Sequence, residues 1–318
     1  MTEATATFAL EGPLDLDLTL RLLRVGPLDP TMIVRSDEAW IAVHPEAGPS
    51  ALHVRFRGGE VLARAIGPAA EWLIAQAPRF VGVGYVPRPF DHPKLDEAAQ
   101  RRLGHRPCVA PVLVDVVVRY VAQQRVTFPD AAAAYRQLVL RFGASVAGAP
   151  DGLRAPPSAR TLAKLPYFEL HPLGIERRRA ETIVAVAKRA RRVEALRDAG
   201  HDEARAKLAL FPGVGPWTRE MVLGVGLGDF DALPLHDYHL PHLVAYCLAG
   251  EERDRSKHGA DDEADRRMLE LLAPYAGQRF RAVQLLDAFY TSTGGPFRGE
   301  PRRGPRHPRL PWAFRSDR

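Results

Sequence analysis

The sequence contains very little cysteine. Its 318 residues include two cysteines, Cys108 and Cys247, which lie far apart and form no CxxC pair. A disulfide framework or a cysteine-ligated zinc or iron–sulfur site needs more cysteines at closer spacing. We therefore expect both residues to be buried free thiols.

Long apolar runs are also missing. The most apolar segment, VLVDVVVRYVA, is too short and too charged to span a bilayer. The first ten residues, MTEATATFAL, lack the basic start and the apolar run of a secretory signal. These absences favour a cytoplasmic protein with no membrane partner, which is expected to be nucleoid-associated if its partner is DNA.

The charge is unevenly distributed along the chain. The formal net charge is +6, and residues 298–318 alone hold seven arginines against two acids. Residues 152–192 hold ten Lys or Arg against three Glu. Local basic patches suit an anionic partner, and nucleic acid is the first candidate. Scattered basic residues are also common on solvated helix faces, which is the simpler alternative.

The N-terminal part has the character of a β-rich domain. Hydrophobic residues make up 46% of the chain, which is enough for two or three small domains. Within residues 1–90, short apolar runs rich in β-branched and aromatic residues alternate with Pro, Gly and Asp. This pattern predicts strands and hairpins, with one helix near residues 69–77.

The remainder is predicted to be helical. Residues 91–297 show helical periodicity in successive segments, of which 177–199 is predicted as one helix. Residues 87–107 are predicted as the connection to the β-rich domain, and residues 298–318 hold too much Pro and Arg to pack, which predicts a disordered tail. The predicted class is α+β, with an antiparallel β-rich domain followed by an all-helical region.

The most informative segment is KLALFPGVGPWTREMVLGVGLGDFDALPLHD, residues 207–237. It predicts a helix ending near Leu210, a tight turn, and a second helix opened by Pro216, which suits the first helical position. Glycines in such a turn let backbone N–H groups approach an anion, and the helix dipole adds partial positive charge. A phosphate therefore fits at Gly213 and Gly215, although a plain corner between packed helices is the simpler alternative.

Together with the LPLHDY ending, the FPGVGPWT run resembles the hairpin of the helix-hairpin-helix DNA glycosylase superfamily, and within it the 3-methyladenine DNA glycosylase II branch. The segments RTLAKL, LGIERRRAETI and VRYVAQQRVT and the β-rich start are similar to that branch as well. The resemblance covers roughly residues 5–293, and the hairpin is its most specific part. It implies an enzyme of base excision repair that flips a damaged base out of double-stranded DNA.

Trp217 separates the branches of this superfamily. In bifunctional relatives a lysine at this position forms a Schiff base with the sugar and permits strand cleavage. A tryptophan cannot do so. The resemblance therefore implies a monofunctional glycosylase, which cuts only the N-glycosidic bond and has no AP lyase activity.

Asp237 stands at the family position of the catalytic carboxylate, 22 residues after Gly215. Breaking the N-glycosidic bond develops positive charge on the deoxyribose, and a nearby carboxylate stabilises that charge or orients the attacking water. An alkylated purine already carries positive charge and leaves readily, so one carboxylate suffices. The alternative role for Asp237 is an N-cap of the helix beginning at His239, and the two roles are compatible.

Three histidines, His236, His239 and His242, surround this aspartate. Their spacing follows no known zinc pattern, so we predict no transition-metal site and interpret them as surface histidines or neighbours of a DNA phosphate. No cofactor is expected to be required. The resemblance implies a site for a monovalent cation, Na⁺ or K⁺, at the hairpin carbonyls of Ala209, Phe211 and Val214.

The resemblance also implies residues for the base pocket and for DNA binding. Aromatic faces attract a cationic ring, such as that of 3-methyladenine or 7-methylguanine, by about 0.5 to 2 kcal/mol per contact. The loop after the segment VRYVA stands where the family has its duplex wedge, which is assigned here to Arg125, and an exposed loop arginine without this role is the alternative. The predicted pocket residues are Trp217, Met221, Tyr238, Phe289 and Tyr290, and the predicted DNA contacts are Gly213, Val214, Gly215, Gln124, Arg125, Arg177, Arg178, Arg179 and Arg281.

These inferences favour a monomeric glycosylase that binds damaged double-stranded DNA and excises alkylated purines. Two alternatives stay open. One is a helix-hairpin-helix protein that binds DNA structures after losing catalysis, since Gln123, Arg125 and Met221 depart from the family pattern. The other is a glycosylase for oxidised or deaminated bases.

Overall fold

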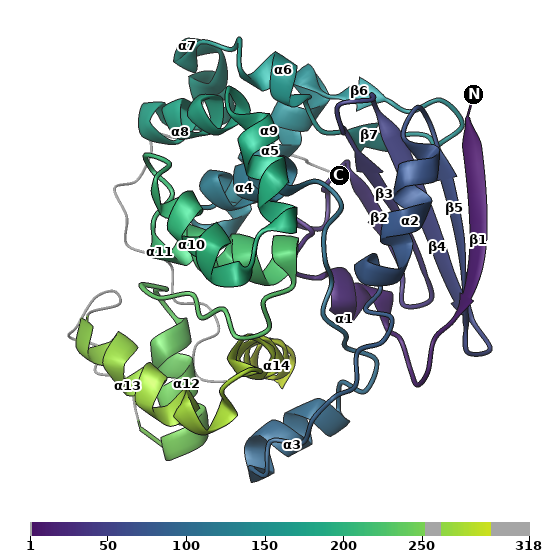
Figure 1. Ribbon diagram of the computed structural model, residues 1–318. Helices are drawn as coiled ribbons and strands as arrows, with labels where there is room; N and C mark the ends of the chain where they lie inside the picture. Colours follow the sequence, from purple (N-terminus) through teal and green to yellow (C-terminus); the bar gives the residue numbers. More distant parts are fainter. Residues whose placement is uncertain (1, 252–261, 294–318) are drawn as a thin grey trace, which may run out of the picture.

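An antiparallel five-stranded sheet forms one side of the molecule in the computed structural model, which describes residues 2–251 and 262–293, with side chains up to Phe289 (Figure 1). The strand order is β1-β5-β4-β3-β2. The helical region packs on the other side of the molecule. The strands are β1 (Glu3–Ala9), β2 (Met32–Val34), β3 (Glu38–Val43), β4 (Ser50–Arg57) and β5 (Glu60–Ile66).

The sheet is built around a two-residue hairpin between β4 and β5. Gly58 and Gly59 both have positive φ, at 61° and 83°, which is the geometry that a tight hairpin turn between twisted strands requires. The helix α2 (Ala70–Phe80) covers the sheet with Leu73 and Phe80, which are both fully buried. The predicted strands, hairpin and helix near residues 69–77 are therefore confirmed.

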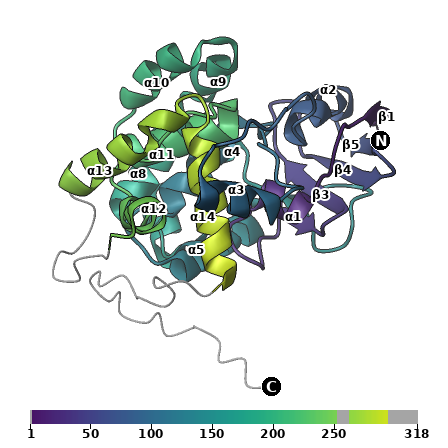
Figure 2. The ribbon, with the colours of Figure 1, turned by 90° about the horizontal axis from the view of Figure 1, so that it is seen from below.

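The helical region is organised around α4 (Leu113–Ala122), the predicted apolar helix, in which every residue is buried. Figures 1 and 2 show it in the middle of the region, surrounded by other helices. The other helices are α1 (Leu16–Leu20), α3 (Pro93–Gln100), α5 (Phe128–Phe142), α6 (Ala159–Leu162), α7 (Tyr167–Leu170), α8 (Arg177–Ala187), α9 (Ala190–Glu194), α10 (His201–Ala209), α11 (Pro216–Val222), α12 (Leu240–Ala249), α13 (Asp262–Leu272) and α14 (Arg279–Thr293).

Shorter elements complete the fold. The two-residue strands β6 (Ala144–Ser145) and β7 (Arg154–Ala155) pair in a second small sheet. A π-helical turn at Leu223–Leu227 follows α11 directly. The 3-10 turns lie at His171–Leu173, Ala195–Asp198 and Ala273–Tyr275. The predicted α+β class is confirmed, and the predicted tail at 298–318 lies outside the described residues.

One sequence-based boundary is wrong. The single helix predicted over 177–199 is broken, because α8 ends at Ala187 and the backbone leaves the helical region at Arg189, with φ −116° and ψ 24°. The break turns the next segment so that Val193 and Leu196 are buried in the core. The predicted connection at 87–107 also contains α3, which has His92 as its cap and Pro93 in its first turn.

A buried ionic cluster joins the N-terminal part to α4. The Arg119 guanidinium donates to Asp29 at 2.9 Å, to Asp115 at 2.8 Å and to the hydroxyl of Thr31 at 2.7 Å. The Asp115 carboxylate also accepts a hydrogen bond from the hydroxyl of Tyr135. Because a buried charge is costly unless it is paired, this cluster fixes how the sheet and the helices meet.

Both cysteines are buried, as predicted, and they do not form a disulfide. Burial raises the pKa of the Cys108 thiol. Within residues 2–251 and 262–293, no helix combines the length and the apolarity that a bilayer crossing needs.

Candidate active site

The glycine turn predicted from the sequence lies between α10 and α11, and it packs against α8. Gly213 has φ +85°, and a Cβ there would lie 1.9 Å from the hydroxyl of Thr182 on α8. Gly215 has an ordinary φ of −78°, and a Cβ there would meet open space. The turn is therefore held closely to the protein at Gly213 and is open to an approaching molecule at Gly215.

The loop after α4 is fastened to this turn. The amide nitrogen of Gln124 donates to the carbonyl of Gly213 at 2.9 Å and to the hydroxyl of Thr218 at 2.7 Å. Gln124, predicted to contact DNA, thus uses its amide nitrogen inside the protein. The next residue, Arg125, is exposed and has φ +56°, a backbone conformation that is unusual for a residue with a Cβ. This fastening places the Arg125 loop beside the hairpin.

The Asp237 carboxylate is held by three hydrogen-bond donors. Its Oδ2 accepts from the indole Nε1 of Trp217 at 2.7 Å. Its Oδ1 accepts from the backbone N–H of His239 at 2.8 Å and from that of Leu240 at 2.9 Å. The carboxylate caps the start of α12 and at the same time faces the first turn of α11. Of the two compatible roles that the sequence left open, these hydrogen bonds support the one at the start of α12, whose N-cap residue is His239, and the catalytic role stays a prediction.

The indole of Trp217 connects the carboxylate to the core. Its ring packs edge-on against Tyr120 of α4, with centroids 5.7 Å apart. The hydroxyl of Tyr120 in turn donates to the carbonyl of Leu22 at 2.8 Å. A well-fixed indole delivers its N–H in one direction, which orients the Asp237 side chain. No sequence pattern indicates the part played by Tyr120 or by Thr218.

The neighbouring histidines do not converge on a metal. His236 donates its backbone N–H to Asp265 at 2.9 Å, and its ring Nδ1 lies 3.2 Å from the same carboxylate oxygen. The His239 ring lies edge-on to Tyr238, with centroids 4.7 Å apart. Among the residues that the structure describes, no group of three or more His, Cys, Asp or Glu is arranged to hold a metal ion.

The predicted pocket residues fall into two groups. Trp217 and Tyr238 are half-buried and lie at or beside the carboxylate. Met221 is buried in the hydrophobic core, and Phe289 lies beneath the guanidinium of Arg101 at the end of α3, at 5.4 Å. Tyr290 belongs to α14, but its side chain lies outside the described residues. For Met221, Phe289 and Tyr290 a place in the pocket stays a prediction.

Apart from Arg125, four arginines were predicted to bind DNA, and they fall into an exposed pair and a buried pair. Arg177 and Arg178 are exposed at the start of α8. Arg179 is 2% exposed and donates to the carbonyls of Ala122 and Gly174, and Arg281 is 8% exposed and donates to the carbonyl of Arg88. Neither buried guanidinium is available to DNA phosphates, contrary to the prediction.

Burial also shifts the pKa of these two arginines. Desolvation lowers the pKa of both Arg179 and Arg281, although nearby acidic groups act in the opposite direction. Arg281 also lies over the ring of Phe90, at 4.5 Å. The pattern of basic residues in the sequence cannot distinguish such structural arginines from those that face a ligand, because their burial depends on the tertiary fold.

Of the carbonyls predicted to hold a monovalent cation, that of Ala209 ends α10, and those of Phe211 and Val214 lie in the turn. The carbonyl of Phe211 accepts the N–H of Val214 at 3.0 Å, which closes the turn. Val214 is buried, so its N–H serves the turn rather than DNA. Whether Phe211, Val214 and Ala209 bind a cation stays a prediction.

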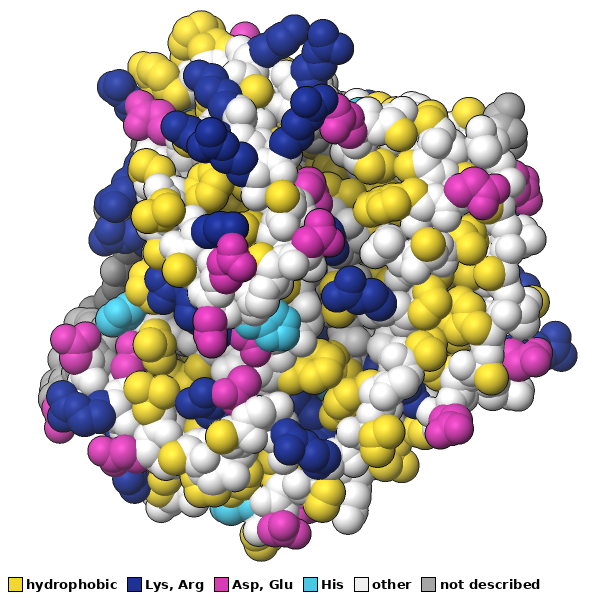
Figure 3. All heavy atoms as spheres, in the orientation of Figure 1, with side chains coloured by type: hydrophobic (Ala, Val, Ile, Leu, Met, Phe, Trp, Pro, Cys, Tyr) yellow, Lys and Arg dark blue, Asp and Glu magenta, His cyan; other side chains and the backbone are white. Residues whose placement is uncertain are grey.

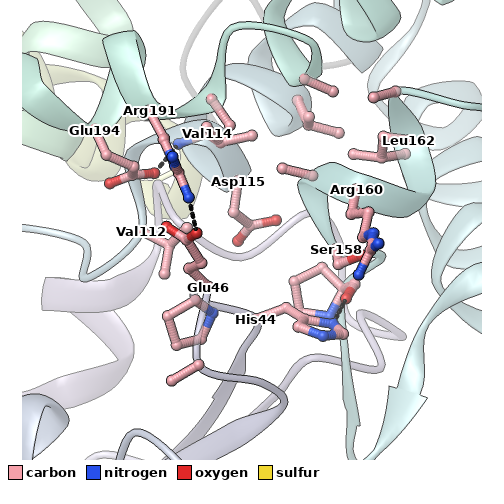
Figure 4. Close-up of a pocket in the computed structure, with 18 of the residues that line it drawn as sticks. His44, Glu46, Val112, Val114, Asp115, Ser158, Arg160, Leu162, Arg191 and Glu194 are labelled. Atoms are coloured by element: carbon pink, nitrogen blue, oxygen red, sulfur yellow. Dashed lines mark hydrogen bonds and ion pairs between the residues drawn. The ribbon is translucent and has the colours of Figure 1, made fainter.

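A large cleft lies elsewhere, between the sheet and the helices α6 and α9, with a volume near 1940 Å³ (Figure 4). Glu46 and Arg191 approach each other across it and form an ion pair at 2.6 Å. Figure 3 shows basic side chains gathered over the elements beside this cleft, at the top of the view. None of the predicted site residues lines it, so the cleft is distinct from the Asp237 site.

Two curated proteins are similar to parts of this chain, and both have DNA repair names. No family model matches the chain. A stretch of 131 residues, 40% of the chain, is 35% identical to the "Probable bifunctional transcriptional activator/DNA repair enzyme AlkA" of Mycobacterium tuberculosis and covers 25% of it. A stretch of 111 residues is 30% identical to the "Putative DNA-3-methyladenine glycosylase YfjP" of Bacillus subtilis and covers 39% of it. Both matches thus span less than half of these relatives.

Solved structures share the fold over nearly the whole chain. A 3-methyladenine DNA glycosylase from Archaeoglobus fulgidus has a TM-score of 0.73 at 21% identity, covering 91% of this chain and 99% of that one. MBOgg1, solved with a low-affinity DNA ligand, has a TM-score of 0.68 at 15% identity, covering 93% and 100%. At identities of 21% and 15%, these similarities establish the fold but not the activity or the substrate.

Proposed function

We propose that the chain is a member of the helix-hairpin-helix DNA glycosylase superfamily and that it acts as a monofunctional DNA glycosylase of base excision repair, which removes alkylated purines. The names of its relatives support the substrate class, since one of them is described as a 3-methyladenine glycosylase. The enzyme acts as a monomer on damaged double-stranded DNA.

One observation carries this proposal. The Asp237 carboxylate, far from the hairpin in sequence, lies 2.7 Å from the indole nitrogen of Trp217 in the first turn after the hairpin. A group that binds the DNA backbone and a group that can act on a nucleotide are therefore adjacent. A plain corner between helices, the simpler alternative, does not require a carboxylate at this place.

The chemistry assigned to Asp237 follows from how a glycosidic bond breaks. When the bond between the base and C1′ lengthens, positive charge grows on the sugar, and a fixed carboxylate stabilises that charge without having to reorganise. Water then adds to C1′ and loses a proton, which leaves an abasic sugar and the free base. A cationic alkylated purine leaves as a neutral molecule, so no residue has to protonate it.

The absence of strand cleavage follows from Trp217. A Schiff base with the sugar needs an amine nucleophile next to C1′. The side chain that reaches Asp237 at this position is an indole, whose nitrogen is a hydrogen-bond donor only and is not nucleophilic. We assign to the ring the further role of a wall for the flipped base, together with Tyr238.

DNA binding is assigned to the exposed side of the hairpin. The N–H groups at Gly213 and Gly215 face the backbone of the damaged strand, since the open space at Gly215 leaves room for a phosphate. Arg177 and Arg178 add charge nearby, and Arg125 is the wedge that occupies the gap left by the flipped base. The hairpin carbonyls supply oxygen ligands of the kind that Na⁺ or K⁺ binds, and no other cofactor is assigned.

The test is a base-release assay with the purified chain. Duplex DNA treated with a methylating agent should yield free 3-methyladenine or 7-methylguanine, and the product strand should break only after alkali treatment. Parallel duplexes contain 8-oxoguanine or uracil. Base release from these duplexes alone would show that the substrates are oxidised or deaminated bases and not alkylated purines. Tight DNA binding without base release from any duplex would favour a non-catalytic DNA-binding protein.

A further inference from the structure

A buried carboxylate on α13 contacts the residue that precedes Asp237. Asp265 is 5% exposed, although it belongs to a helix whose other acidic residues are exposed. Its Oδ2 accepts the backbone N–H of His236 at 2.9 Å and lies 3.2 Å from the His236 ring Nδ1. Figure 1 shows α13 beside α12, the helix that Asp237 caps.

His236 has a backbone conformation that needs outside support. Its φ is +59°, in the left-handed region that residues with a Cβ rarely adopt. The chain therefore turns sharply just before Asp237. The contacts that oppose relaxation of this turn are the two that His236 makes with Asp265, from its backbone N–H and from its ring.

The turn sets the direction in which Asp237 leaves the backbone. Trp217 and the N–H groups of His239 and Leu240 hold the carboxylate itself. If His236 relaxed to a negative φ, the Cα of Asp237 would move and the carboxylate could not keep all three bonds. Small misplacements of a catalytic group are costly to rate even when substrate binding is unchanged.

A second observation on Asp265 points to a role beyond packing. Its Oδ1 is buried and has no hydrogen-bond partner within the described part of the chain. Desolvation raises its pKa, with further contributions from Asp262 and Asp237, while the contacts from His236 act in the opposite direction. A buried, half-satisfied carboxylate is unfavourable for folding, and such groups are most common where function requires them.

We propose that Asp265 is a positioning residue, which acts through His236 to hold Asp237 at the sugar of the flipped nucleotide. This inference rests on the proposed function, since it assumes that Asp237 is the catalytic carboxylate. Asp265 itself does not touch the substrate. Asp265 supplies a fixed hydrogen-bond acceptor for His236, the residue at which the chain turns.

The first experiment compares Asp265→Ala with Asp265→Asn. Asparagine can still accept the N–H of His236, whereas alanine cannot. We expect the single-turnover rate of 3-methyladenine release to fall about tenfold in Asp265→Ala and to stay within about threefold of wild type in Asp265→Asn. The dissociation constant for duplex DNA should change less than about twofold in both. Asp262→Ala, an exposed acid on the same helix, is the matched control and should leave the rate unchanged.

The second experiment separates positioning from stability. Glycine adopts positive φ without a steric penalty, so His236→Gly should restore the rate of Asp265→Ala to within about threefold of wild type. Loss of packing alone would not be rescued in this way. If Asp265→Ala does not fold, Asp265→Leu removes the acceptor at similar volume, with the same expected loss and rescue.

The outcomes distinguish this inference from the proposed function. Full activity in Asp265→Ala, with no activity in Asp237→Asn, would overturn the role of Asp265 and leave the glycosylase assignment intact. Equal losses in Asp265→Asn and Asp265→Ala, or no rescue by His236→Gly, would also overturn it. No base release by the wild-type protein would overturn the proposed function itself.

Discussion

At the scale of single residues, the central feature is one hydrogen bond. The Trp217 indole N–H reaches Asp237 at 2.7 Å, while the ring packs on Tyr120. This side chain cannot itself form a Schiff base, and its N–H orients the carboxylate. A hydrogen bond to a charged group contributes about 1.5 to 3 kcal/mol, which corresponds to a rate effect that is easy to measure if the contact strengthens catalysis.

Replacing Trp217 tests this bond. Trp217→Phe keeps an aromatic ring near Tyr120 but removes the N–H, so we expect single-turnover base release to fall about tenfold or more while the protein stays folded. Rates are measured with enzyme in excess over methylated duplex. Trp72→Phe, at the separate cleft, is the control and should leave the rate unchanged. Equal rates for Trp217→Phe and wild type would show that the bond has no catalytic role.

At the scale of elements, the hairpin depends on two glycines for different reasons. Gly213 combines a positive φ with close packing on Thr182, whereas Gly215 has an ordinary φ and faces open space. The two are indistinguishable in the sequence GVG. The structure assigns the first to folding and leaves the second for ligand approach.

A pair of alanine variants tests this division of roles. Gly213→Ala should lower the free energy of unfolding by about 3 kcal/mol, because the new Cβ meets Thr182 and the left-handed conformation becomes strained. Gly215→Ala should change it by less than about 1 kcal/mol but weaken binding to duplex DNA, since the methyl group occupies the open space. Urea denaturation and a DNA-binding titration measure the two effects. Equal stability of the two variants would contradict this assignment.

Local elements were predictable, and their tertiary partners were not. The alternation of β4 and β5, the apolar face of α4 and the glycine turn all have sequence patterns of fixed period or spacing. The break after α8 and the burial of Arg179 have none, because each depends on which distant segment packs there. The spacing between the turn and Asp237 predicted their functional link, but not the indole that joins them.

At the scale of the whole molecule, one histidine couples stability to pH. The ring Nδ1 of His105 is buried, and this residue lies near Phe280 and Gln284 of α14. Burial lowers the pKa of His105 to about 4, and the charges of Arg281, Arg21 and Arg102 act in the same direction. A hydrogen bond with Gln284 opposes the shift. The folded protein therefore takes up this proton only near pH 4 and below.

The sign of the effect on stability follows from this lowered pKa. Below pH 6.5 the unfolded chain protonates His105 and the folded protein does not, so its contribution to the free energy of unfolding is lost between about pH 6.5 and 4. At pH 5 the loss should be about 2 kcal/mol. Denaturation at pH 7 and pH 5 should show a smaller difference for His105→Gln than for wild type. His171→Gln, an exposed histidine, should behave as wild type, and an unchanged difference in His105→Gln would contradict the buried neutral state.

The most direct test of the catalytic assignment is the single-turnover rate of 3-methyladenine release by wild type and Asp237→Asn. Asparagine keeps an acceptor for the N–H groups of His239 and Leu240, so the variant should fold and bind duplex DNA as wild type does. It lacks the negative charge, and we expect its rate to fall by at least about 100-fold. A rate within a few-fold of wild type, in a folded variant, would show that Asp237 is a helix cap and not the catalytic carboxylate.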